Sequence, residues 1–336
     1  MQAVFRSRRA SDIHGGSAPV RRRLRVGRRG SLTLVALTAV AVSTFVSFGA
    51  GLFGRDRSLF FRTPEYHFIQ QLDENSSVDW TGGYVFASSR VRLPRIIYDA
   101  SNSDFGQSGT AASISDARAA ARSKATELAT LRLMNSVTAL RLDSRFTLLE
   151  KMRADAALRE SLGNLASSFI IKSRHTGEGY VSVELAMPFL GEGGLYSMLG
   201  RSYYGTQRPP EVISEEGVTD PISGLVVDLR EFPEFRPSLE PRIFTDRGRL
   251  IFGPEMVGRT CLRQGLVAYY ASAEQARRDP RVGGQSYYTY AAGVLGTGKS
   301  DIYLDAEDAE RILGHRSGRV ALSRCSIVFV LKQTDR

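Results

Sequence analysis

The sequence predicts an α+β protein with an N-terminal transmembrane helix, then a domain built from a helix and an antiparallel sheet, and then a β-rich C-terminal domain. Three observations lead to this prediction. Residues 31–54 carry no charge, apolar side chains recur at helical spacing after Ser113, and short apolar runs separated by turn residues follow residue 222. A chain of 336 residues, 42% of them hydrophobic, can bury one large core or two ordinary ones.

The first 57 residues predict a membrane anchor. They hold eleven arginines and two aspartates, and residues 1–30 form a basic tail before the uncharged segment 31–54. A helix of ~20 apolar residues crosses a hydrocarbon core, and an arginine-rich flank stays on the cytoplasmic side. We therefore expect a single-pass protein of the bacterial inner membrane, with a cytoplasmic N-terminus and the bulk of the chain in the periplasm.

Other interpretations of segment 31–54 stay open. A cleaved secretory signal has the same orientation, but Phe48 fits poorly at the third position before a cleavage after Ala50. Arg28 and Arg29 resemble the start of a twin-arginine export signal. A buried soluble helix would leave the one-sided arginines unexplained. No cysteine lies near the segment, which excludes a lipid-modified N-terminus.

The net charge of +10 is concentrated in this N-terminal region, and the rest of the chain is nearly neutral. A body without a basic face lacks the electrostatic footprint that binds a polyanion. We therefore expect no nucleic-acid partner.

Residues 58–200 are expected to form the first folded domain. Ser113 and Asp116 have the spacing of a helix cap, and the pattern that follows predicts one long helix over residues 113–140. Its expected apolar face consists of Ile114, Ala117, Ala121, Ala125, Leu128 and Leu131. A second helical stretch covers residues 145–165. Trp80, the only tryptophan, is interpreted as a packing residue.

A β-hairpin is predicted after the two helices. The runs of residues 167–175 and 179–189 bracket Gly177, Glu178 and Gly179, which favour a turn. In the second run, apolar residues alternate with Ser182, Glu184 and Ala186. This alternation predicts a strand with one buried face.

The helix "ISDARAAARSKATELATLRLMNSVTALRLDS" and the hairpin "FIIKSRHTGEGYVSVELAMPFLGEGGL" resemble the LPP-twenty family of bacterial envelope lipoproteins and the amino-terminal domain of flagellar assembly protein T. The resemblance covers residues 83–200. It implies a small α+β domain of the cell envelope that acts through protein contacts. The lipidated cysteine of that family is missing here, which agrees with a transmembrane segment as its substitute.

Residues 201–222 are rich in Pro, Gly and acidic residues and predict a linker. Residues 223–332 are expected to form the β-rich C-terminal domain. Asp246, Arg247 and Gly248 predict a turn between two strands, and further apolar runs reach residue 332. One short helix is expected after Asp305.

The stretch from Gly293 to Ser300 matches the letters of a phosphate-binding P-loop, G-x-x-x-x-G-K-[ST]. A working P-loop needs a helix that begins at its Lys-Ser pair and points its dipole at the phosphates. Here a strand pattern with Asp301 at its start follows instead. We therefore predict a tight turn and no nucleotide.

No other pattern predicts a catalytic, cofactor or metal site. The four histidines lack metal-ligand spacing, and the acids between Asp301 and Glu310 lack the glycine and terminal glutamate of a calcium loop. The alternative function is glycan or peptidoglycan binding by a set of tyrosines, namely Tyr269, Tyr270, Tyr287, Tyr288 and Tyr290. An unrecognised enzyme would require a deep pocket with convergent ionisable groups.

Cys261 and Cys325 are the only cysteines, and both lie in the expected C-terminal domain. Export into an oxidising compartment allows them to form a disulfide. The alternative is two unpaired packing residues. The sequence thus predicts a membrane-tethered periplasmic interaction or scaffold protein of the envelope, linked to flagellar or envelope assembly and without catalytic activity.

Overall fold

The computed structural model describes residues 64–156, 158–160, 170–177, 179–199, 221–258 and 261–333. All of them belong to one compact unit. The expected basic tail (1–30), the anchor (31–54) and most of the linker (201–222) lie outside the described residues. Within the described part, no helix is both long enough and apolar enough to cross a membrane.

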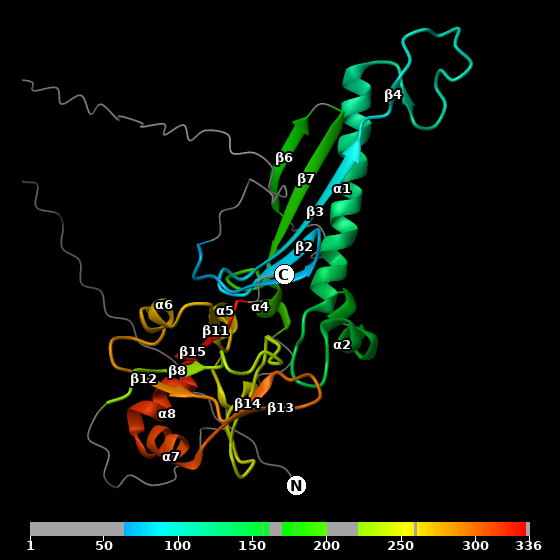
Figure 1. Ribbon diagram of the computed structural model, residues 1–336. Helices are drawn as coiled ribbons and strands as arrows, with labels where there is room; N and C mark the ends of the chain where they lie inside the picture. Colours follow the sequence, from blue (N-terminus) through cyan, green and yellow to red (C-terminus); the bar gives the residue numbers. More distant parts are fainter. Residues whose placement is uncertain are drawn as a thin grey trace, which may run out of the picture. The chain divides into compact units, whose positions relative to one another are not determined.

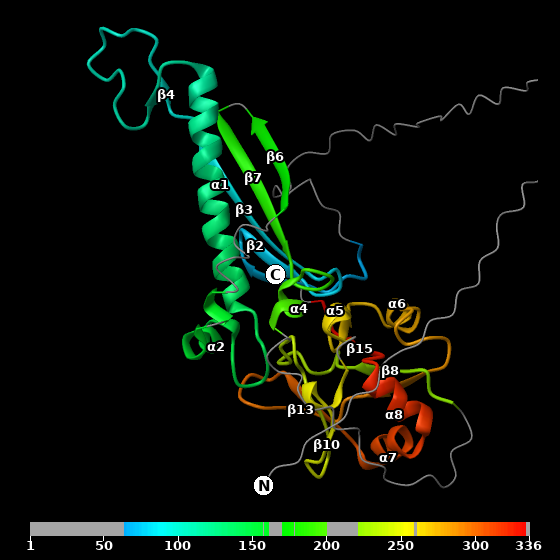
Figure 2. The ribbon, with the colours of Figure 1, turned by 180° about the vertical axis from the view of Figure 1, so that it is seen from behind.

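The first domain is a five-stranded antiparallel sheet with one long helix across a face. Its strands lie in the order β1 (Ile69–Asp73), β2 (Ser76–Asp79), β3 (Tyr84–Arg92), β7 (Tyr180–Pro188) and β6 (Ile170–Gly177). The predicted hairpin is therefore confirmed. Helix α1 (Ile114–Ala139) runs along β3 and β7 in both ribbon views (Figure 1, Figure 2).

Helix α1 begins where the sequence predicts, because the Ser113 side chain accepts a hydrogen bond from the Asp116 N–H. Its buried stripe repeats every fourth residue: Ala117, Ala121, Ala125, Ala129, Leu133 and Val137. Alanine lets the helix approach the sheet so closely that the Ser89 hydroxyl on β3 donates to the Ala125 carbonyl at 2.6 Å. The expected face was wrong at Ile114 and Leu131, which are exposed.

Short elements connect to the ends of α1. Strands β4 (Arg95–Ile96) and β5 (Thr110–Ala111) pair in parallel, and the loop between them extends beyond the start of α1 (Figure 1). Helix α2 (Leu148–Ala154) follows α1 and starts with a capping box of Thr147 and Glu150. Helix α4 (Leu195–Leu199) ends the first domain.

The C-terminal domain contains a parallel sheet, which the sequence analysis did not predict. Its strands lie in the order β11 (Ala268–Tyr270), β15 (Ile327–Val330), β8 (Gly224–Asp228) and β12 (Ser286–Tyr290), and every neighbouring pair is parallel. Helix α6 (Ala273–Arg277) covers one face; α7 (Ala306–Gly314) and α8 (Arg316–Ser323) cover the other (Figure 1, Figure 2).

A second, mixed sheet completes this domain. It has the order β10 (Leu250–Phe252), β9 (Ile243–Thr245), β14 (Asp301–Leu304) and β13 (Gly293–Leu295). The predicted turn at Asp246–Gly248 joins β9 to β10, and the predicted helix after Asp305 is α7. A 3₁₀ turn η1 (Pro254–Met256) and helix α5 (Cys261–Gln264) lead to β11. The prediction of a β-rich domain was therefore incomplete, because the described part of this domain also contains helices α5, α6, α7 and α8.

The two domains share one continuous hydrophobic core. The segment before β1 reaches the edge of the parallel sheet, where His67 forms an antiparallel bridge with Tyr270 and Ala271 N–H donates to the Tyr66 carbonyl at 2.9 Å. The α1–α2 loop makes a second junction, because Leu239 N–H donates to the Arg141 carbonyl at 3.0 Å. The boundary that the sequence predicts between the two domains therefore does not separate two hydrophobic cores.

Candidate functional site

The carboxyl ends of the parallel strands are where ligands bind in open α/β sheets. In this protein the strands β8 and β12 end at Asp228 and Tyr290. The buried Asp228 carboxylate accepts hydrogen bonds from the Arg230 guanidinium at 2.6, 3.0 and 3.1 Å and from the Tyr288 hydroxyl at 2.5 Å. The backbone N–H of Arg230 donates to the same carboxylate. This edge therefore carries a closed polar cluster.

The cluster determines the charge of its members. Burial alone would raise the pKa of Asp228, but the hydrogen bonds from Arg230 and Tyr288 outweigh it and hold that pKa below its usual value. Burial and the neighbouring carboxylate raise the pKa of Tyr288 to about 12. Asp228 is thus ionised and Tyr288 neutral at pH 7. Because its carboxylate is saturated with donors, Asp228 is poorly suited to act as a base.

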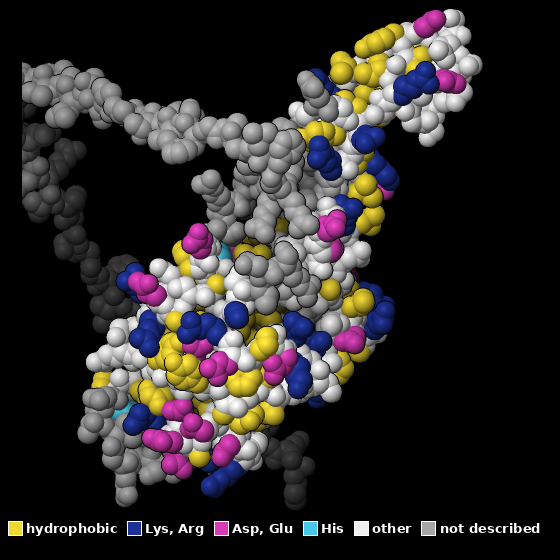
Figure 3. All heavy atoms as spheres, in the orientation of Figure 1, with side chains coloured by type: hydrophobic (Ala, Val, Ile, Leu, Met, Phe, Trp, Pro, Cys, Tyr) yellow, Lys and Arg dark blue, Asp and Glu magenta, His cyan; other side chains and the backbone are white. Residues whose placement is uncertain are grey.

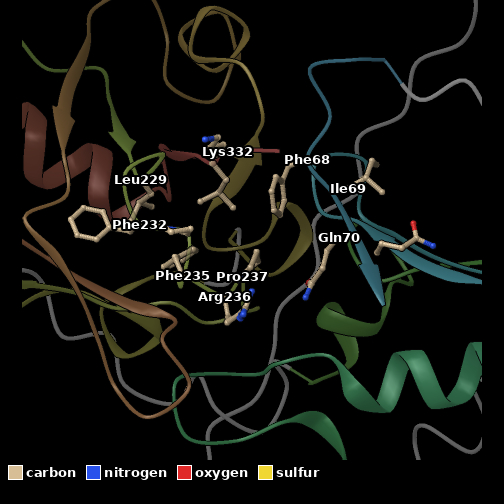
Figure 4. A pocket seen from close by; sticks show the side chains of 12 residues that line it. Phe68, Ile69, Gln70, Leu229, Phe232, Phe235, Arg236, Pro237 and Lys332 are labelled. Atoms are coloured by element: carbon tan, nitrogen blue, oxygen red, sulfur yellow. The ribbon is translucent and has the colours of Figure 1, made fainter. Parts of the chain in front are cut away.

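A small hollow, here called the front hollow, lies at the same edge between the two domains (Figure 4). Figure 4 shows Phe68 on one side, Leu229 and Phe232 on the other, and the cationic Lys332 and Arg236 at opposite ends. Its volume is about 80 Å³. Pockets for whole small molecules typically measure ~300–1,000 Å³. The front hollow is therefore smaller than a typical pocket for a whole small molecule.

A larger hollow of about 400 Å³, here called the Arg281 hollow, opens beside β11. Its walls come from both domains, and its charged members are Asp279 and Arg281. Among the described residues that line the two hollows there is no histidine or cysteine. Within the same part of the chain, no group of His, Cys, Asp and Glu side chains is placed to hold a metal ion.

Cys261 and Cys325, the predicted pair, are joined by a disulfide with their Cα atoms 5.9 Å apart. Both are fully buried. Cys325 has a positive φ of 57° and ends α8, where Ser326 N–H donates to the Ala321 carbonyl and Cys325 N–H to the Leu322 carbonyl. Glycine usually takes this position. The bond thus connects helix α5 to the turn between α8 and the central strand β15.

The P-loop letters fall on a strand and a hairpin turn. Strands β13 and β14 are antiparallel, and no helix begins at Lys299 or Ser300. Gly298 N–H donates to the Ser144 carbonyl at 2.8 Å, and the Ser144 hydroxyl donates to Asp301 at 2.5 Å. Burial raises the pKa of Asp301, while Ser144 and the Arg242 N–H oppose this shift. Gly298 therefore allows the β13–β14 turn to contact the first domain.

The five conspicuous tyrosines do not form a single exposed cluster. Tyr269 is buried and donates to the Ser238 carbonyl at 2.8 Å, while Tyr270 lines the Arg281 hollow. Tyr287 contacts Asp308 on the α7 face, and burial raises its pKa to about 12. Tyr288 contacts the ring of Tyr290 edge-on at 5.7 Å. Among the five, Tyr290 alone is classed as exposed, at 61%.

Trp80, His67 and Asp305 also have structural partners. Trp80 packs edge-on against Phe189 and Tyr269, which confirms its packing role. His67 hydrogen-bonds the buried Asp79 at 2.8 Å. Asp305 caps α7 by accepting from the Asp308 N–H, as expected of acids at a helix start. Figure 3 shows acidic side chains gathered around this helix.

Sequence reasoning missed Asp228, Arg230, Asp279 and Arg281. Asp228 directly follows the buried run Gly224–Val227, and a charge at the end of a continuous apolar strand is the signal that could have identified it. Asp279 and Arg281 stand in a polar turn between α6 and β12 without any local pattern. Only the three-dimensional fold places Asp279 and Arg281 in the wall of the Arg281 hollow.

The chain is thus a mixed α+β protein whose C-terminal domain presents hollows around a small parallel sheet. Residues 224–333, from the first strand of that domain to just past its last, are similar to the family described as Treponema pallidum Tp0624, second domain. This match covers less than half of the chain and lies outside residues 83–200, whose resemblance to the LPP-twenty family stays a prediction. No curated protein matches the chain.

Proposed function

We propose that this protein is an interaction or scaffold protein of the bacterial envelope, tethered to the inner membrane through residues 31–54 with its folded body in the periplasm. The observation that carries the proposal is the disulfide between Cys261 and Cys325. Disulfides persist in oxidising compartments and are rare in the cytosol. The arginines of residues 1–30 give the orientation, because such flanks stay in the cytoplasm.

Two surfaces support a role in protein contacts. The β4–β5 loop and the start of α1 expose Tyr98, Phe105 and Ile114, with exposed fractions of 75%, 39% and 45%. Figure 3 shows apolar side chains at this end of the molecule, among polar and charged ones. Exposed apolar patches of this kind commonly mark interaction sites. The front hollow, with two cations at its ends, is suited to one apolar side chain of a partner and its acidic neighbour.

Photo-crosslinking in living cells tests this proposal. A photoreactive amino acid at Tyr98 is expected to capture a discrete envelope partner, because the side chain is exposed at the proposed contact. The matched control is the same amino acid at Lys124, an exposed position on α1. Equal labelling from both positions, or no labelling from either, would contradict a partner at the β4–β5 loop.

Peptidoglycan binding is the second candidate, and the exposed Tyr290 favours it. A sugar ring could stack on Tyr290, while Arg277, 4.1 Å from the ring of Tyr288, and Arg230 supply cations for sugar-linked carboxylates. Purified cell wall should retain the wild-type protein and lose Tyr290→Ala, while the control Tyr98→Ala is retained like wild type. Retention of Tyr290→Ala at the wild-type level would exclude this surface.

A further inference from the structure

The Arg281 hollow has the size and lining of a small-molecule site that nothing above has used. Its volume of about 400 Å³ falls within the usual range for bound small molecules. Trp80 and Leu190 of the first domain and Ala268 and Pro280 of the second contribute apolar side chains to its walls. The other lining residues are Thr81, Gln264, Tyr270 and the charged pair Asp279 and Arg281, so the walls are of mixed polar and apolar character.

Arg281 is the fixed cation of this hollow. Its guanidinium donates to the Gly265 carbonyl at 3.2 Å and to the Gln264 carbonyl. A guanidinium has five N–H donors, so these two bonds leave others to face a ligand. Burial lowers the pKa of Arg281, which reflects the cost of keeping this charge away from water. A carboxylate in the hollow would compensate that cost through charge-assisted hydrogen bonds.

Asp279 is the fixed anion. Its carboxylate accepts the backbone N–H of Arg281 at 2.8 Å, which sets the turn that carries both residues. The Tyr270 hydroxyl also hydrogen-bonds this carboxylate, and the charge of Asp279 opposes the effect of burial on the pKa of Arg281. The hollow therefore presents one charge of each sign. A simple anion would gain from Arg281 but would be repelled by Asp279.

We propose that the Arg281 hollow binds a free α-amino acid with an apolar side chain. The carboxylate of the ligand pairs with Arg281, its ammonium group with Asp279, and its side chain packs against Trp80 and Leu190. A zwitterion is the ligand class that matches both charges at once. This inference is independent of the proposed role in envelope contacts.

Calorimetry on the purified full-length protein tests it. Phenylalanine is expected to bind saturably, while 3-phenylpropionate, which lacks the ammonium group, and phenethylamine, which lacks the carboxylate, each bind at least about tenfold more weakly. One charge-assisted hydrogen bond contributes ~1.5–3 kcal/mol, which is about tenfold or more in affinity. Absence of saturable phenylalanine binding, or equal binding of all three probes, would overturn the proposal.

Asp279→Asn separates the proposed role from a structural one. Asparagine keeps an oxygen that can accept the Arg281 N–H but removes the negative charge. We expect about tenfold weaker phenylalanine binding and unchanged or tighter 3-phenylpropionate binding. The control Arg278→Gln removes an exposed cation that pairs with Glu274 at 2.7 Å, and should leave both affinities unchanged. If Asp279→Asn keeps the wild-type preference for phenylalanine, Asp279 does not bind the ammonium group.

Discussion

At the scale of single residues, Asp228 illustrates how the carboxyl end of the parallel sheet holds a buried charge. The Arg230 guanidinium, the Arg230 backbone N–H and the Tyr288 hydroxyl all donate to its carboxylate. Together they replace the water that the carboxylate loses on burial. The same bonds pin the end of β8 to the edge strand β12.

Asp228→Asn is expected to lower the free energy of unfolding by about 1–3 kcal/mol at pH 7, because the bonds from Arg230 lose their ionic partner. The pKa of Asp228 is lowered in the folded state, so this stabilisation is present above its unfolded value of about 3.9 and is lost as the pH falls through the folded value. Urea unfolding of wild type and variant from pH 7 to pH 3 measures it.

The two stability curves should converge at the acid end of that range. Asp99→Asn is the control, because Asp99 is exposed in the β4–β5 loop and its loss should change stability by less than ~0.5 kcal/mol. A constant difference between wild type and Asp228→Asn at every pH would show that the charge is not responsible.

At the scale of elements, sequence patterns predicted those helices, strands and turns that depend on contacts between residues close together in the chain. Helix α1, the β6–β7 hairpin, the Asp246–Gly248 turn and helix α7 each depend on residues close together in sequence, through caps, turns and alternation. The parallel sheet does not, because β8 pairs with β15 about a hundred residues later. Its buried runs Gly224–Asp228 and Ile327–Val330 indicate strands but not their partners.

The candidate sites were unpredictable for the same reason. Asp228 and Tyr288 are 60 residues apart, and Ser144 and Asp301 are 157 apart, yet each pair is hydrogen-bonded. Helix α8 was missed because Gly318 and two arginines interrupt its apolar pattern, while its packing against β8 stabilises it. Tertiary contacts outweigh weak local propensity in such short helices.

Two neighbouring residues of the β13–β14 turn, Gly298 and Lys299, are expected to respond differently to substitution by alanine. A Cβ at Gly298 would lie 2.7 Å from the Ser144 carbonyl oxygen, so Gly298→Ala must displace backbone of the other domain. We expect a loss of about 1–3 kcal/mol. Lys299→Ala alters an exposed side chain and should stay within ~0.5 kcal/mol. Chemical denaturation of both variants measures the difference.

If the turn were a nucleotide site, Lys299 would be essential for nucleotide binding. The turn interpretation expects neither wild type nor Lys299→Ala to bind ATP in the presence of magnesium. Saturable micromolar binding that Lys299→Ala abolishes would contradict it.

At the scale of the whole molecule, a shared core and a disulfide hold the described body together. Residues of both domains contribute to one hydrophobic cluster, and the disulfide closes a loop of 64 residue steps. In the chain-entropy model such a loop contributes ~4 kcal/mol to stability. A body that relies on this bond is suited to an oxidising compartment, which is the central claim of the proposed function.

A topology reporter fused after Arg336 tests that claim most directly. The proposal predicts activity from a phosphatase that works only in the periplasm, because the arginines of residues 1–30 hold the N-terminus in the cytoplasm and residues 31–54 cross the membrane once. A reporter that functions only in the cytoplasm should be silent at the same junction. Activity of the cytoplasmic reporter, with a silent phosphatase, would place the folded body on the wrong side of the membrane and contradict the account.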